Sequence, residues 1–173
     1  MKNILLLLLT VFLLGCAEND DTSAVPIIGT YRDSSVYMAY RNADGADLLD
    51  ASTPGYFKED ALQLYYVRDG VADEVYDSNM DMRRNMRLES TEQGIALVVF
   101  TDEPPQAKSV AGKVVTGQAI TLLKLNETIT DTITTEWERK PGNFHVVKVW
   151  YNGELKWDRS TTPIKPLITI VKE

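Results

Sequence analysis

The sequence predicts an all-β protein, an immunoglobulin-like antiparallel β-sandwich of about seven to nine strands over residues 28–173. Short apolar or alternating segments follow one another with turn residues between them. Two dipeptides, Asp69-Gly70 and Asn152-Gly153, stand between such segments and suit type I′ hairpin turns, in which both turn residues adopt positive φ. No segment shows a helical period longer than two turns. A small barrel is the alternative architecture.

The candidate segments for these strands each show strand-like patterning or hairpin flanks. In chain order they are residues 29–41, 62–68, 71–76, 80–88, 95–100, 119–125, 133–138, 144–151, 154–158 and 167–172. Alternation predicts the strand at 80–88, because Met80, Met82, Met86 and Leu88 fall on one face, with Arg84 as the exception. Residues 95–100 are apolar throughout, which is typical of a central strand covered on both sides. Residues 104–117 contain Pro104-Pro105, Gly112 and Gly117 and are expected to be mostly loop.

The first residues predict a signal peptide. Lys2 precedes an apolar run over residues 4–14, which as a helix would span about 16 Å. A bilayer core of about 30 Å needs a longer helix, so the run is too short to cross it. The run ends in Leu13-Leu14-Gly15-Cys16, which resembles the lipobox of bacterial lipoproteins. This resemblance implies cleavage after residues 1–15 and acylation of Cys16, whereas the alternative is an unmodified cysteine in an apolar helix.

The segment after the cysteine predicts a tether. Residues 16–27 begin polar and acidic, without a hydrophobic period, and are expected to be flexible. The acidic cluster at residues 18–21 resembles the surface-export signal of Bacteroidetes lipoproteins, with an ordinary solvated linker as the alternative. We therefore expect a domain attached to the outer membrane through Cys16, on either the cell-surface or the periplasmic side. Because Cys16 is the single cysteine, no disulfide within the chain is possible.

Charge and residue counts disfavour several functions. The chain carries 18 basic and 25 acidic side chains, for a net charge of −7, which disfavours nucleic-acid binding. The single histidine, His145, lies inside an expected strand, so a catalytic triad or a zinc site is not indicated. Paired-carboxylate chemistry stays open because acids are numerous, but no pair is singled out. We expect the protein not to be an enzyme.

Several stretches resemble an uncharacterised family of small Bacteroidetes lipoproteins. They are residues 41–50, 56–60, 62–66, 147–154 and 168–172. These stretches consist of turns and core strands, which specify a fold and not a chemistry. The resemblance implies a β-sandwich domain and carries over no catalytic residue.

The hairpin around Asn152-Gly153 suggests a ligand platform. With a two-residue loop, Trp150 would pair with Leu155, and Lys148 would pair with Trp157. If the opposite face is buried, both tryptophans are exposed beside Lys148 and suit a sugar ring or a partner protein. The alternative is that both tryptophans belong to the core.

A calcium site is the one cofactor that the sequence suggests. Asn42, Asp44, Asp47 and Asp50 supply four oxygen-bearing side chains around Gly45. The full EF-hand pattern is not met, because the glycine comes too early. The alternative is a turn, in which Asn and Asp side chains accept hydrogen bonds from nearby backbone.

Asp131-Thr132-Ile133 resembles the O-glycosylation site of exported Bacteroidetes proteins, which would modify Thr132. A chance match within a threonine-rich strand is the alternative.

Taken with the anchor, these features predict a non-catalytic binding module for a glycan or a protein at the cell envelope. The alternative is a structural or assembly subunit of an envelope complex, fimbrial or transporter-associated.

Overall fold

The structure is a computed structural model that describes residues 31–104 and 113–173. Within these residues the strands are β1 (Tyr31–Asp33), β2 (Ser35–Asn42), β3 (Gln63–Arg68), β4 (Val71–Glu74), β5 (Met86–Thr91), β6 (Gly94–Phe100), β7 (Val115–Lys124), β8 (Thr130–Lys140), β9 (Asn143–Tyr151), β10 (Glu154–Asp158) and β11 (Leu167–Lys172). A short 3-10 helix, η2 (Glu59–Ala61), precedes β3. The predicted all-β sandwich is confirmed.

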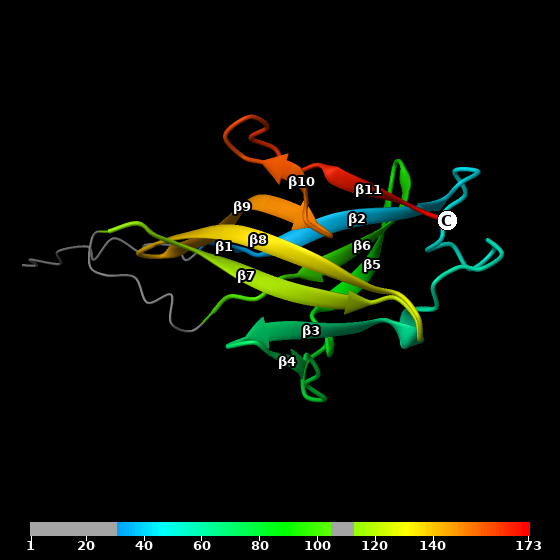
Figure 1. Ribbon diagram of the computed structural model, residues 1–173, viewed down its shortest axis with the longest axis horizontal. Coiled ribbons are helices and arrows are strands. Elements are labelled where there is room, and N and C mark those ends of the chain that lie inside the picture. The colour runs from blue at the N-terminus through cyan, green and yellow to red at the C-terminus, as the bar shows by residue number, and fades with distance from the viewer. Residues whose placement is uncertain (1–30, 105–112) are drawn as a thin grey trace, which may run out of the picture.

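The strands form two sheets that pack face to face (Figure 1). The larger sheet has the order β1-β9-β8-β7-β3-β4, with β10 also paired to β9, and the smaller has the order β11-β2-β6-β5. Two pairs, β1 with β9 and β11 with β2, are parallel, so both sheets are mixed and not purely antiparallel as predicted. The strand count is also higher than predicted, in part because the single segment predicted at residues 29–41 divides into β1 and β2, which belong to different sheets.

The core lies between the sheets and follows the period of two that a strand imposes on its side chains. Val36, Met38 and Tyr40 point inward from β2, and Leu97 and Val99 point inward from β6. The Tyr40 ring is fully buried and packs edge to face with Phe57 at 5.6 Å between centroids. Burial of large aromatic and aliphatic side chains of this kind is the main force that holds the two sheets together.

Both predicted hairpin turns are confirmed. Asp69 and Gly70 have φ values of 51° and 80°, and Asn152 and Gly153 have values of 48° and 84°. Positive φ at both central residues gives the turn a twist that matches the right-handed twist of the flanking strands. These turns fix the pairing of β3 with β4 and begin the pairing of β9 with β10.

The predicted strand at residues 80–88 is wrong over most of its length. The backbone N–H of Asp77 donates to the carbonyl of Arg83, and Asn85 adopts a left-handed φ of 47°. Met80, expected on the buried face, is 55% exposed. This segment connects β4 in one sheet to β5 in the other, so it has no neighbouring strand, and alternation without a pairing partner does not make a strand.

A second, smaller apolar cluster lies on the larger sheet, near the start of β7 and the end of β8. It consists of Ala119, Trp137 and Phe144, with the Trp137 and Phe144 rings 5.8 Å apart. Gly117 pairs with Trp137 across the β7–β8 ladder, and the indole lies directly over it. A Cβ at position 117 would lie 2.3 Å from the Trp137 ring. Because glycine has no side chain, the indole can pack against the backbone at this position.

Two buried carboxylates join the sheets. Asp131 on β8 accepts hydrogen bonds from Lys172 on β11 at 2.7 and 2.8 Å, and also from the Tyr151 hydroxyl. Asp102, just after β6, accepts two hydrogen bonds from Arg68 on β3 at 2.9 and 2.6 Å. Each acid is almost fully buried, and a buried carboxylate of this kind requires a cationic hydrogen-bonding partner.

Candidate functional site

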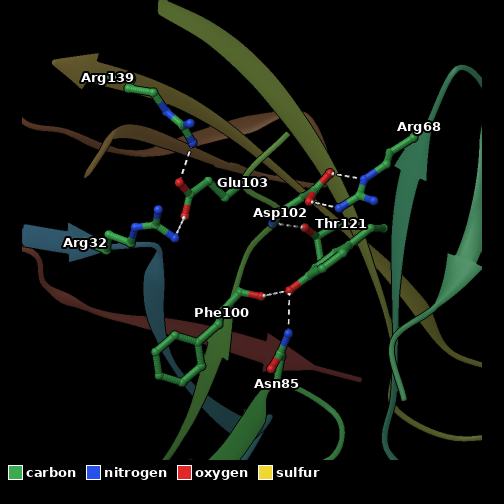
Figure 2. Close-up of polar contacts among 9 residues, drawn as sticks. Arg32, Arg68, Asn85, Phe100, Asp102, Glu103, Thr121 and Arg139 are labelled. Carbon is green, nitrogen blue, oxygen red and sulfur yellow. Dashed lines mark hydrogen bonds and ion pairs between the residues drawn. The ribbon is translucent and has the colours of Figure 1, made fainter. Parts of the chain in front are cut away.

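The crossing from β6 to β7 shows how the chain secures its connections between sheets (Figure 2). After Phe100 the chain presents Asp102 to Arg68 and Glu103 to both Arg32 and Arg139. The Tyr66 hydroxyl donates to the Phe100 carbonyl at 2.8 Å. Each charged group in this network pairs with a neighbour, so the network ties the end of β6 to the larger sheet.

Two clefts are lined by described residues and are open to solvent. The larger, here called the loop cleft, has a volume of about 950 Å³ and lies among residues 49–62, the 76–84 connection and the start of β5. The smaller, here called the basic cleft, has a volume of about 550 Å³ and lies where β1 passes into β2 and the 159–165 connection approaches β9. Both volumes fall in the range of small-molecule sites.

The loop cleft combines an apolar wall with charged side chains of both signs. Leu62 and Leu97 are buried in its wall, and Tyr76 is 54% exposed at its rim. Its charged lining residues are Lys58, Glu59, Asp60, Asp81, Arg83, Arg84 and Arg87. Such a lining offers flat rings together with hydrogen-bond donors and acceptors.

One arginine fixes the walls of the loop cleft relative to each other. The Arg84 guanidinium donates to the carbonyls of Asp60 and Leu62 at 2.9 and 2.6 Å. This contact pins the connection between β4 and β5 against the start of β3. Lys58 and Arg83 are exposed nearby and form no ion pair with another described residue. The cleft therefore retains charged groups that a ligand can reach.

The basic cleft is built on core residues. Trp157 on β10 lines it with only 4% of its surface exposed, and its indole N–H donates to the Thr162 carbonyl at 2.7 Å. Lys165 donates to the Ser35 carbonyl at 2.7 Å and to Asp33 at 2.8 Å, and its ammonium lies 5.9 Å from the centre of the Trp157 ring. These contacts hold the 159–165 connection against the start of β2.

The charges of the basic cleft influence one another. Burial lowers the pKa of Lys165, although Asp33 opposes this effect. Burial acts to raise the pKa of Asp33, but hydrogen bonds from Lys165 and Ser35 outweigh it, so that pKa lies below its ordinary value. Burial and then the positive charge of Arg159 lower the pKa of His145, against the opposing influence of Glu138, which lies 3.5 Å away. Arg159 thus acts on both His145 and Lys165.

The predicted tryptophan platform is wrong. A bulge at Lys156 in β10 shifts the β9–β10 register, so Trp157 pairs with Val149 and not with Lys148. Trp157 therefore points into the core, while Trp150 stays half-buried on the outer face. Lys148 forms an ion pair with Glu136 at 3.3 Å. The alternation of the sequence does not reveal bulges, which is why both tryptophans were expected on one face.

The four residues of the suggested calcium site build a turn. The Asn42 side-chain oxygen accepts from the backbone of Asp44 and Ala46, and Asp50 accepts from the backbone of Ser52. Asp47 accepts from the backbone of Ile95 at 2.9 Å and pairs with Arg41 at 2.5 Å. Among the described residues, no group of three or more His, Cys, Asp or Glu side chains is arranged to hold a metal.

Thr132 lies on β8 with a half-buried side chain, and its backbone N–H donates to the Asn152 side chain at 2.7 Å. The preceding Asp131 is the buried acid that binds Lys172.

Cys16 and the tether lie outside the described residues. Over the ranges 31–104 and 113–173, no helix has the length and apolar character needed to span a membrane.

Sequence reasoning missed both clefts. The basic cleft gathers Arg32, His145, Arg159 and Lys165, which come from separate parts of the chain. The parallel pairing of β1 with β9 brings two of these parts together, and that pairing leaves no local signal. The only hint was the Pro163–Pro166 stretch, which predicts an irregular connection able to carry exposed charges.

Comparison of the chain with protein-family models, with curated proteins and with solved structures gave no match.

Proposed function

We propose that this protein is a lipid-anchored, non-catalytic binding module of the bacterial outer membrane and that it binds a glycan in the loop cleft. The Leu13-Leu14-Gly15-Cys16 sequence and the acidic tether support the anchor. The shape and lining of the loop cleft support the binding role. The observation that carries the proposal is the loop cleft itself, which has a volume of about 950 Å³, an apolar wall, aromatic rings and accessible charges of both signs.

The chemistry of a glycan matches this lining. A sugar ring presents C–H groups on its faces and hydroxyls around its edge. Tyr56 and Tyr76 offer rings for the faces, while Lys58, Asp81 and Arg83 offer donors and acceptors for the hydroxyls. The anchor would hold such a module close to the glycans of the envelope, where weak affinity is raised by proximity.

The acids of the loop cleft support binding more than hydrolysis. Glycoside hydrolysis needs one carboxylic acid in apolar surroundings that keep its proton, set opposite a second carboxylate. Glu59, Asp60 and Asp81 are all exposed to solvent. Exposed acids serve as hydrogen-bond acceptors for hydroxyls, which is the role that we assign to them.

A glycan array probed with the mature lipidated protein in detergent micelles tests this proposal, after intact mass has established cleavage before Cys16 and acylation of its thiol. We expect retention on a subset of glycans that Tyr76→Ala weakens by up to about 10-fold, since a stacked ring contributes about 0.5–1.5 kcal/mol. Leu155→Ala is the control, because Leu155 is 49% exposed on the β9–β10 hairpin and lines neither cleft. No retained glycan, or equal losses in both variants, would contradict the proposal.

A further inference from the structure

The basic cleft concentrates positive charge in an acidic protein. Its lining includes one acid, Asp33, and four side chains that are cationic at neutral pH, namely Arg32, Arg87, Arg159 and Lys165. The whole chain has a net charge of −7. Positive charge in a cleft with protein walls attracts anions more strongly than the same charge on a convex surface.

Three of these cations already have acidic partners. Lys165 pairs with Asp33 at 2.8 Å, Arg32 lies 3.6 Å from Glu103, and Arg87 lies 3.0 Å from Glu89. The Arg159 backbone N–H donates to the Val147 carbonyl, which places this residue on the 159–165 connection beside β9. Its exposed guanidinium forms no ion pair with another described residue.

Arg159 lines the basic cleft together with two other basic groups, His145 and Lys165. Its charge contributes to lowering the pKa of His145, after the effect of burial, and to lowering the pKa of Lys165 in the same way. Asp33 and Glu138 offset part of the resulting repulsion at Lys165 and His145, and an anion bound on Arg159 would reduce it further. A guanidinium matches a carboxylate or a phosphate through two parallel hydrogen bonds.

Aromatic side chains line the same cleft and indicate what else the ligand carries. Tyr31 is 59% exposed, and Tyr37 and Phe100 are partly exposed. The Arg87 guanidinium lies 5.4 Å from the centre of the Phe100 ring, so that ring and a cation present one continuous surface. We therefore expect the ligand to carry a ring that packs against this aromatic surface, in addition to its anionic group.

We propose that the basic cleft is a second binding site, which takes an anionic sugar and holds its carboxylate or phosphate group on Arg159. The sugar ring lies against the aromatic wall formed by Tyr31, Tyr37 and Phe100. This site is separate from glycan binding in the loop cleft and does not depend on it, although Arg87 lines both clefts. An anionic sugar and a neutral glycan can therefore be bound by one chain.

Isothermal titration calorimetry on the mature lipidated chain in detergent tests this inference with D-glucuronate, glucose 6-phosphate and glucose. We expect one or both anions to bind at least about 10-fold more tightly than glucose, because hydrogen bonds to charged groups discriminate by that amount. The glucuronate and phosphate arms distinguish a carboxylate ligand from a phosphate ligand.

Arg159→Gln and Arg83→Gln form a matched pair, since both remove one exposed arginine, one from each cleft. Arg159→Gln should lower anion affinity about 10-fold, whereas Arg83→Gln should leave it within about 2-fold. Equal binding of glucose and both anions, or equal loss in the two variants, would overturn the inference. Loss of array binding in Tyr76→Ala with unchanged anion affinity would support both sites independently.

Discussion

The two clefts differ in how their side chains are held. The basic cleft is lined by strand residues and by Trp157 and Lys165, both of which are fixed by hydrogen bonds to backbone carbonyls. The loop cleft is lined mainly by residues of two connections, and its Tyr76 and Arg83 are exposed. A wall that belongs to the core is organised before a ligand arrives, whereas a wall of exposed loop side chains can adapt.

This difference separates the cost of mutation from its effect on binding. In the basic cleft, Trp157 and Lys165 contribute both to folding and to the shape of the site. In the loop cleft the residues that can reach a ligand contribute little to folding. Substitution of Trp157 or Lys165 should therefore lower stability, whereas substitution of Tyr76 should lower binding with little change in stability. Three experiments measure that contrast.

The largest effect is expected at the wall of the basic cleft. Trp157→Ala should lower the free energy of unfolding by about 3–5 kcal/mol, because it opens a cavity beside Val149 and removes the hydrogen bond to Thr162. Trp157→Phe keeps much of the apolar volume and should cost clearly less. Urea unfolding followed by fluorescence measures both variants. A cost for Trp157→Ala below about 1 kcal/mol would show that the indole is not part of the core.

A smaller effect is expected at Lys165. Lys165→Ala should lower the free energy of unfolding by about 1–2 kcal/mol, because the Ser35 carbonyl and Asp33 lose their donor. Lys165→Met retains the alkyl stem against Trp157 and should recover part of this loss. Thermal unfolding of the two variants at neutral pH gives the comparison. Identical values for both would show that the alkyl stem of Lys165 contributes nothing by packing.

The smallest effect on stability is expected in the loop cleft. Tyr76→Ala should change the free energy of unfolding by no more than about 0.5 kcal/mol, since the ring is 54% exposed. The same variant is expected to weaken glycan binding by up to about 10-fold. A loss of stability as large as that of Trp157→Ala would mean that Tyr76 belongs to the core and that the two clefts do not differ in this respect.

The sequence predicts the β-sandwich and its local turns well. Positive φ at Asp69-Gly70 and Asn152-Gly153 follows from residue chemistry that acts over two positions, so these turns are readable without the rest of the chain. The apolar run at 95–100 likewise indicates β6, which lies between β2 and β5. In each case the signal and the structure lie in the same short segment.

The clefts were not predictable in the same way. Trp157 was placed on the wrong face because one extra residue in β10, Lys156, reverses the orientation of the side chains beyond it. The alternation at residues 80–88 gave a false strand because pairing, and not pattern alone, makes a strand. Arg159 and His145 lie close to each other through tertiary packing, which composition and spacing do not encode.

The close approach of Gly117 and Trp137 has a consequence for how this sequence varies over evolution. Any side chain at position 117 would meet the indole at a distance that atoms do not tolerate. In related chains we therefore expect the two positions to change together, with glycine kept wherever position 137 is tryptophan and larger residues appearing only where position 137 has become small. A glycine at position 117 followed twenty residues later by tryptophan then becomes a signature by which distant relatives are recognisable.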